Sequence, residues 1–138
     1  VFKEVGKSGV KLIDFGSACF ANKKEFTYIQ SRYYRSPEIV LVKPYDSKID
    51  VWSLGCLIYE IYTGTPLFPS RTEEEQMQML LSTLGAPPQH FLEKCDRGKE
   101  FDFSNWVGKP PKMSLREKLK NAPGSMVSLV EKMVRWSP

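Results

Sequence analysis

The longest apolar stretch of the chain lies between positions 48 and 63, where only three of the sixteen residues carry a charge. Apolar side chains would occupy every side of the helix formed by this stretch, which is typical of a helix enclosed by the rest of a domain. Ser47 and Asp50 have the spacing of a capping box, and Gly64 provides a C-terminal stop. The pattern therefore predicts a helix over 48–63 that other segments surround.

A second helix is predicted after this central one. Thr72 and Glu75 have capping-box spacing, and Gly85 with the prolines that follow it ends the helical pattern. Between them, apolar residues recur at the i, i+3, i+4, i+7 spacing of one helix face, at Met77, Leu80, Leu81 and Leu84.

The last third of the chain predicts three shorter helices around an irregular stretch. A short helix fits 88–95, whereas 96–113 has no hydrophobic period and is interpreted as a surface insertion. Ser114 and Glu117 form a third capping-box pair, for a helix that reaches Asn121. A final amphipathic helix carries its apolar face on Met126, Leu129, Val130, Met133 and Val134.

The N-terminal third has a different pattern. Residues 10–13 (Val-Lys-Leu-Ile) predict a short strand, and residues 1–2, before a Gly-rich turn, are interpreted as the end of a partner strand. Residues 17–46 are polar with interleaved aromatics, and an ordered loop of that length is usually functional. The expected fold class is mainly α, with a short N-terminal β-hairpin.

Composition excludes several classes of protein. The 138 residues are 41% hydrophobic and 26% charged, as in an ordinary globular domain or part of one. No apolar run approaches the ~20 residues that a membrane span requires, and the first residues lack a signal-peptide pattern. Three widely spaced cysteines form neither a disulfide framework nor a zinc pattern, so we expect an intracellular protein of the cytoplasm or nucleus.

The charge is unevenly distributed. Residues 1–48 hold nine Lys/Arg and five Asp/Glu, and the remaining residues hold eleven of each. All of the net charge of +4 therefore lies in the first third. This favours a local anion, such as a phosphate, over direct nucleic-acid binding.

Three short motifs occur in a fixed order. Asp14-Phe15-Gly16 is followed 22 residues after Asp14 by Ser36-Pro37-Glu38, and 12 residues after Glu38 by Asp-Val-Trp-Ser-Leu-Gly at 50–55. A lone Asp-Phe-Gly is weak evidence, but this order and spacing resemble the protein kinase signature. The run Tyr-Ile-Gln-Ser-Arg-Tyr-Tyr-Arg-Ser-Pro-Glu at 28–38 resembles the dual-specificity tyrosine-regulated kinase (DYRK) family or a close relative. The resemblance is close over 10–85 and looser beyond.

The resemblance implies a partial kinase domain over 1–138, truncated within the helical C-terminal lobe. Residues 1–16 would hold the strand pair and the metal-binding motif, 17–38 the activation segment, and 39–138 the helical lobe with an insert at about 86–125. The parent enzyme would use ATP and Mg²⁺ to phosphorylate Ser/Thr in protein substrates, often with Arg or Pro near the acceptor, and its own tyrosine. The Gly-rich loop, the strand lysine and the catalytic loop would precede the chain, which alone would be inactive. A pseudokinase scaffold and a helical interaction domain that matches by chance are the alternatives.

The resemblance also implies roles for residues near the metal and phosphate. Asp14 would hold Mg²⁺, Phe15 would pack behind it, and Gly16 would let the backbone turn. Tyr28 would be the autophosphorylated residue, and its phosphate would pair with arginine side chains at Arg32 and Arg35. The plainer alternatives are a turn-capping carboxylate at Asp14 and a core tyrosine flanked by solvated arginines.

Further roles follow from the same resemblance. The Ser31 hydroxyl would contact the catalytic loop, and Ile29 to Ser31 would line the pocket for the residue after the phosphoacceptor. Glu38 would be buried beside an arginine located beyond Pro138. Asp50 would accept N–H groups of the catalytic loop and, without that loop, would be a buried unsatisfied charge; a simple helix-capping acid is the alternative. Structural positions of the central helix are expected at Trp52 and Gly55.

Overall fold

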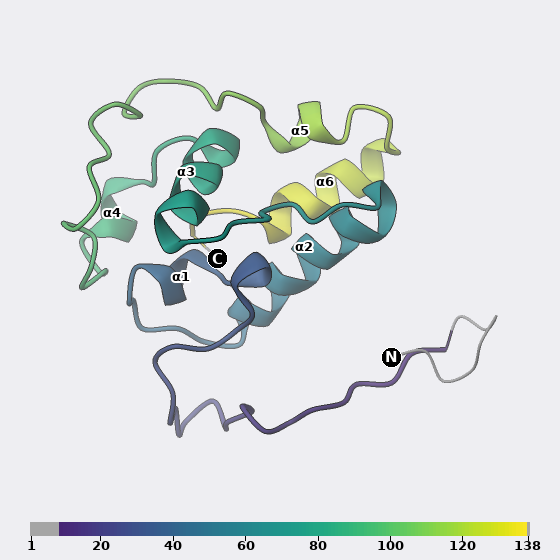
Figure 1. Cartoon of the computed structure of the whole chain (residues 1–138), viewed down its shortest axis with the longest axis vertical. Helices are drawn as coiled ribbons and strands as arrows, with labels where there is room; N and C mark the ends of the chain where they lie inside the picture. The colour runs from purple at the N-terminus through teal and green to yellow at the C-terminus, as the bar shows by residue number, and fades with distance from the viewer. Residues whose placement is uncertain (1–8, 138) are drawn as a thin grey trace.

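One central helix organises the part of the chain that this computed structural model describes, residues 9–137. Helix α2 (Lys48–Thr63) packs along α6 (Gly124–Met133), and α3 (Glu73–Leu84) lies to one side of the pair (Figure 1). The remaining elements are short: the 3₁₀-helix η1 (Arg32–Tyr34), α1 (Pro37–Val40), α4 (Gln89–Leu92) and α5 (Leu115–Lys118). The described residues thus form a helical body, as the apolar pattern predicts.

The core brings together aromatic side chains from distant parts of the sequence. Trp52 of α2 stacks on Phe68, with ring centroids 5.9 Å apart and planes 11° apart. Near the C-terminus, the Trp136 ring lies 6.0 Å from that of Phe91, and its indole N–H donates to the Gly85 carbonyl at 3.1 Å. The final residues are therefore bound to the end of α3 and contribute to the same core.

Helices α2 and α6 approach closely at Gly55. A Cβ atom at this position would lie 2.7 Å from Cγ2 of Val134 and 2.9 Å from Cβ of Met133. Both distances are shorter than carbon atoms tolerate, so only glycine permits this spacing of the helices. The structural role expected for Gly55 has this physical basis.

The three predicted capping boxes differ in outcome. The reciprocal pair of Ser114 and Glu117 is fully formed at α5. The Thr72 hydroxyl caps α3 by accepting from the Glu75 N–H at 3.1 Å, but the Glu75 carboxylate accepts from the backbone of the preceding Arg71. Each of these two helices therefore begins where the sequence predicts.

The capping box predicted at Ser47 is wrong. Ser47 already has helical backbone angles, and its side chain makes no cap hydrogen bond. The carboxylate of Asp46 instead accepts from the Lys48 N–H at 2.8 Å. The cap has moved one residue towards the N-terminus because the helical turn begins earlier than the spacing suggests.

Within residues 9–137, other segments cover α2 on one side only. One face of α2 is buried, while the opposite apolar face is exposed at Val51, Leu54, Leu57, Ile61 and Tyr62. No described segment covers this second face. The apolar pattern of α2 is typical of a helix that other segments bury on both faces, whereas the described residues bury only one face.

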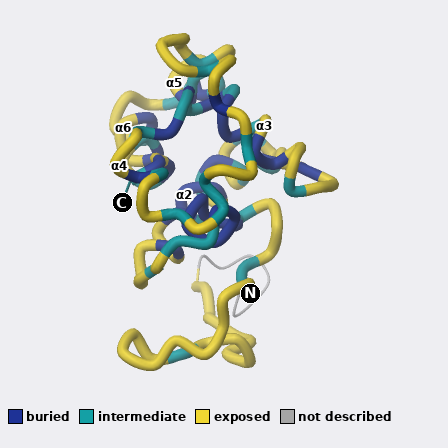
Figure 2. The backbone as a smooth tube through the Cα atoms, turned by 90° about the vertical axis from the view of Figure 1, so that its left-hand side faces the viewer, coloured by how far each residue is buried: buried dark blue, intermediate teal, exposed yellow. Residues whose placement is uncertain are grey.

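The strand expected at 10–13 is wrong as well. Residues 11–13 have no regular structure, and Leu12 is 82% exposed. Figure 2 shows the segment near the N-terminus exposed along nearly its whole length. A strand needs a run of hydrogen-bonding neighbours, but among residues 10–13 only Val10 takes part in a bridge, and the bridge of Phe20 with Lys23 lies within a turn. The expected partner residues 1–2 lie outside the described residues.

The long loop expected over 17–46 contains two short helices, η1 and α1. The proline at the first position of α1 is a helix-start signal that the sequence reading missed.

Residues 96–113 contain neither helix nor strand, but the N–H groups of Asp96 and Arg97 donate to the carbonyls of Val42 and Leu41. Within residues 9–137, no helix has the length and apolar character needed to cross a membrane.

We expect Gly55→Ala to destabilise the full-length protein by about 1–3 kcal/mol, because the added methyl group must displace Val134 and Met133. Urea unfolding measures this change. Gly124→Ala is the matched control, since a Cβ at Gly124 meets no atom within 4 Å. The control should unfold at the same urea concentration or slightly higher; equal stability of Gly55→Ala would contradict the close helix contact.

Candidate functional site

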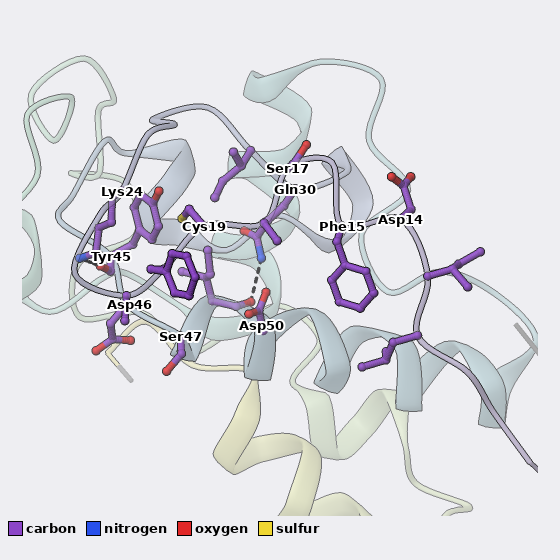
Figure 3. Close-up of a pocket in the computed structure, with 17 residues that line it drawn as sticks. Asp14, Phe15, Ser17, Cys19, Lys24, Gln30, Tyr45, Asp46, Ser47 and Asp50 are labelled. Atoms are coloured by element: carbon purple, nitrogen blue, oxygen red, sulfur yellow. Dashed lines mark hydrogen bonds between the residues drawn. The ribbon is translucent and has the colours of Figure 1, made fainter.

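A cavity of about 590 Å³ lies between the N-terminal segment and the start of α2. Its walls come from residues 12–21, from the backbone around Gln30 and from residues 45–50 (Figure 3). Asp14 and Asp50 both line this cavity, although 36 positions separate them in the sequence. The structure therefore brings the two carboxylates expected near the phosphate chemistry to one cavity.

Asp14 itself has an unusual backbone. Its φ angle is +64°, in the left-handed region that residues with a side chain seldom adopt. The neighbouring Gly16 has no positive φ and lies in a turn closed by the Ala18 N–H and the Phe15 carbonyl at 3.0 Å. The backbone therefore turns at Gly16 as expected, and the left-handed conformation lies at Asp14.

The side chains of Asp14 and Phe15 diverge. Figure 3 shows the Asp14 carboxylate and the Phe15 ring on opposite sides of the backbone, and both residues are exposed. The expected packing of Phe15 behind Asp14 is therefore wrong in this structure, since no described segment covers the ring. Among the described residues, no group of three or more His, Cys, Asp or Glu side chains could hold a metal.

The phenol of Tyr28 lies against a buried guanidinium. Arg35 is only 6% exposed, and its Nη1 donates to the Tyr28 hydroxyl at 2.6 Å. The guanidinium carbon also lies 4.0 Å from the centroid of the Tyr28 ring. Tyr28 itself is 57% exposed, so an accessible hydroxyl is held beside a fixed positive charge.

Arg32 does not share this contact. Its Nη1 donates to the carbonyl of Arg71, at the start of the turn into α3. Of the two arginines expected to flank Tyr28, the structure brings only Arg35 to it. Arg32 would have to release Arg71 before it could reach the Tyr28 hydroxyl.

Gln30 connects this segment to α2, and the sequence reading gave it no role of its own. Its φ angle is +68°, and its amide N–H₂ donates to the Ile49 carbonyl and the Ser53 hydroxyl, both at 2.8 Å. Its amide oxygen accepts from the Ser36 N–H at 2.9 Å. No pattern around a single glutamine predicts such a set of long-range partners.

A second connection runs through Tyr34. The Ser53 hydroxyl donates to the Tyr34 carbonyl at 2.8 Å, and the Tyr34 hydroxyl donates to the Glu60 carboxylate at 2.6 Å. The pKa of Tyr34 rises to about 12, chiefly because its hydroxyl bonds the Glu60 carboxylate and also because the side chain is partly buried. Together with Gln30, these bonds fix residues 30–36 against α2.

The remaining predicted residues lie in different surroundings. Ser31 is exposed and precedes η1 without a side-chain cap bond. Glu38 is buried, and burial raises the pKa of its carboxyl, although the helix backbone and Lys43 oppose the rise. Within residues 9–137 no arginine forms an ion pair with Glu38, so its predicted partner beyond Pro138 stays a prediction.

The expectation of a buried charge at Asp50 is wrong, because Asp50 is exposed at the cavity in the described chain. Exposure lets water solvate the carboxylate. Its expected contact with a catalytic loop stays a prediction, as do the catalytic roles of the other residues. Trp52, by contrast, is buried, and its indole N–H has no hydrogen-bond partner in the structure.

Comparison with known proteins identifies the class. The family model for the protein kinase domain matches residues 1–138, so the chain belongs to the protein kinase family. Its helical structure corresponds to a part of the C-terminal lobe of that fold.

Curated relatives place the chain within that family. It is 51% identical over 83% of its length to a probable serine/threonine-protein kinase, dyrk2, of Dictyostelium discoideum. It is 41% identical over its full length to human dual specificity tyrosine-phosphorylation-regulated kinase 4, and 43% identical over 96% to the DYRK-family kinase pom1 of Schizosaccharomyces pombe. The chain spans 12%, 29% and 13% of these three relatives, respectively. The chain belongs to the DYRK family of protein kinase domains or to a close relative of it, as its motifs predict.

The hydrogen bond between Tyr34 and Glu60 predicts a pH dependence. The raised pKa of Tyr34, about 12 against 10 for an ordinary tyrosine, means that the unfolded chain loses this proton first. Its stabilising contribution is complete below pH 10 and declines as pH rises towards 12. Urea unfolding of the full-length protein between pH 9 and 11 should show a smaller loss of stability for Tyr34→Phe than for wild type.

Glu60→Gln provides the companion variant, since it keeps a hydrogen-bond acceptor but removes the charge that raises the Tyr34 pKa. Its loss of stability between pH 9 and 11 should also be smaller than that of wild type. Identical pH profiles for both variants and wild type would show that this bond does not contribute.

Proposed function

We propose that the protein containing this chain is a protein kinase that phosphorylates Ser and Thr in protein substrates and is activated by phosphate on its own Tyr28. The observation that carries the proposal is the accessible Tyr28 hydroxyl held 2.6 Å from the buried Arg35 guanidinium. Membership of the kinase family supports the reaction class. The DYRK names of the relatives support dual specificity.

Phosphate on Tyr28 would meet a charge that is already in place. A phosphotyrosine carries close to two negative charges, and a guanidinium binds phosphate oxygens bidentately. Arg35 needs no large movement, because it already contacts both the ring and the hydroxyl. Phosphorylation would therefore replace a hydrogen bond between the guanidinium and a neutral phenol with an ion pair between the guanidinium and a phosphate. The ion pair would hold the activation segment more firmly.

ATP and Mg²⁺ are the proposed cofactors. The exposed Asp14 carboxylate on the cavity fits one Mg²⁺ ligand, since Mg²⁺ commonly takes one or two carboxylates together with substrate phosphates. In the reaction, an acceptor hydroxyl oxygen bonds to the γ-phosphorus as the bond to the β-phosphate oxygen breaks, and ADP leaves. A carboxylate of the kinase catalytic loop accepts the hydroxyl proton. Asp14 and Ser31 would lie beside this step.

Other parts of the kinase domain would complete the site. The exposed apolar face of α2 and the exposed Asp50 are the surfaces that the missing N-lobe and catalytic loop would cover. We propose that residues 1–138 alone are inactive for this reason.

We place the protein in the cytoplasm or nucleus, where its free cysteines would stay reduced. A pseudokinase scaffold is the alternative reading.

The backbone at Gln30 supports a preference for the residue after the phosphoacceptor. Arg35 donates to the carbonyl of Ile29 at 3.1 Å and to that of Gln30 at 2.9 Å. The Gln30 carbonyl also accepts from Nε of Arg35 at 3.3 Å, so both of its lone pairs are engaged and a backbone N–H of the substrate would find no acceptor there. Proline has no N–H and would bear no such cost.

We expect Tyr28→Phe in the full-length protein to lower kcat/KM for a protein substrate at least about tenfold, because Arg35 then has no phosphate to bind. Mass spectrometry of the wild-type protein should find phosphate on Tyr28. Tyr33→Phe is the control, since Tyr33 makes no contact with Arg35 in the structure, and it should retain activity. An active wild type without phosphate on Tyr28 would refute the switch, and an inactive wild type would favour the scaffold.

Peptide substrates test the pocket. A peptide with Pro after the acceptor should show a kcat/KM about fivefold above the same peptide with Ala, the equivalent of ~1 kcal/mol for one unpaired N–H. A peptide with N-methyl-alanine at that position separates the lost N–H from ring packing and should behave like the Pro peptide. Equal values for all three would contradict the assignment.

A further inference from the structure

A row of alternating charges leads from the activation segment into the insertion at 96–113. Arg35 Nη1 lies 3.8 Å from Oε1 of Glu73, the first residue of α3. The other oxygen, Oε2, accepts from Arg97 Nη1 at 3.0 Å. Arg97 in turn donates from Nε to Glu100 at 2.6 Å. Three segments far apart in the sequence thus share one chain of charges that ends at Tyr28.

Glu73 is held between two arginines but is satisfied by only one. Its Oε1 atom is buried and has no hydrogen-bond partner in the structure, while the side chain as a whole is 20% exposed. Nη1 of Arg35 lies 3.8 Å from this oxygen and donates one of its two hydrogens to the Tyr28 hydroxyl at 2.6 Å. A buried carboxylate oxygen without a donor is costly, and Glu73 and Tyr28 both face the same Nη1 group.

Arg97 is a fixed member of this row. Its backbone N–H donates to the Leu41 carbonyl at 3.1 Å, and its Nη1 also reaches the Val40 carbonyl at 3.3 Å. Hydrogen bonds to Glu100 and Glu73 raise the pKa of Arg97 above its already high ordinary value, so it is charged at every physiological pH. The insertion therefore supplies a permanent positive charge to Glu73.

We propose that Glu73 is a positioning residue that competes with phosphate on Tyr28 for Arg35, and that Arg97 offsets the charge of Glu73. This inference rests on the proposed function in that the phosphate is the one proposed for Tyr28. Residues 96–100 of the insertion then set how firmly the activation segment holds its phosphate. They do so through one carboxylate, without touching Tyr28.

The proposal predicts opposite effects at the two ends of a single ion pair. When phosphate occupies Arg35, the Glu73 carboxylate is a like charge beside it, so neutralising Glu73 strengthens the hold on the phosphate. Neutralising Arg97 leaves the carboxylate uncompensated and weakens the hold. A purely structural ion pair behaves differently, because removing either partner disturbs the same contact in the same direction.

The test uses the full-length protein with phosphotyrosine incorporated at position 28 during translation, so that the phosphate is present whether or not the protein phosphorylates itself. The readout is the rate constant with which a purified tyrosine phosphatase removes it. Glu73→Gln should slow removal and Arg97→Gln should accelerate it, each about threefold, the size expected for one partly exposed charge pair. Arg97→Lys keeps the charge and should resemble wild type.

The controls are Glu131→Gln and Arg116→Gln, which break a separate ion pair of 2.8 Å between α6 and α5. Neither should change the rate. Rate changes in the same direction for Glu73→Gln and Arg97→Gln, or no change in either, would overturn the proposal. If Arg97→Gln does not fold, the rate of phosphate removal in Glu73→Gln decides alone: slower removal supports the proposal, and an unchanged or faster rate overturns it.

Failure of the proposed function is detected separately. Wild-type protein made with ordinary tyrosine would then carry no phosphate on Tyr28, or no kinase activity, whatever the phosphatase rates show.

Discussion

The arrangement of residues 28–36 depends on the contacts of the buried Arg35 guanidinium. The guanidinium binds the carbonyls of Ile29 and Gln30 on one side and the ring and hydroxyl of Tyr28 on the other. A charge that is only 6% exposed must have its donors satisfied, or burial would cost several kcal/mol. The loop therefore adopts the shape that supplies those acceptors, including the left-handed backbone at Gln30.

Helix α2 gives this loop a rigid support. Ile49, Ser53 and Glu60 lie along its length and each bonds a residue of the loop, through Gln30 or Tyr34. The helix is itself held against α6 at a glycine and stacked through Trp52 on Phe68. Because one helix contacts both, the hydrophobic core and residues 30–36 are mechanically linked. A disturbance at the contact between α2 and α6 would thus reach the segment that holds Tyr28 through the bonds of Gln30 and Tyr34 to α2.

The electrostatics around Tyr28 suit a switch that operates by charge. The hydroxyl is accessible to solvent and to another enzyme, whereas the positive charge beside it is buried and fixed. A modification at such a position changes the local charge without requiring a new arginine to arrive. The carboxylate of Glu73 lies 3.8 Å from Nη1 of the same guanidinium, so the balance of charge at Arg35 depends on α3 and the insertion as well as on the loop.

Local sequence patterns determined the elements that local physics controls. Capping side chains and the i, i+3, i+4, i+7 period predicted α3 and the cap of α5, and the apolar run predicted α2 with its stop at Gly64. The order of three motifs predicted the family. Each cap, period or motif lies within a short stretch of sequence, and the order of the motifs is read along the chain, so no knowledge of the fold is needed to recognise them.

Only the tertiary structure decided which side chains meet. The roles of Gln30, Glu73 and Arg97 arise from contacts between positions 19 to 38 residues apart, for which no local period exists. The same holds where expectations were wrong: residues 10–13 lack a described strand to pair with, and Asp50 lacks a described segment to bury it. Whether a segment pairs as a strand or becomes buried depends on which segments lie next to it in the folded structure. A local sequence pattern indicates only the kind of neighbour that would suit it.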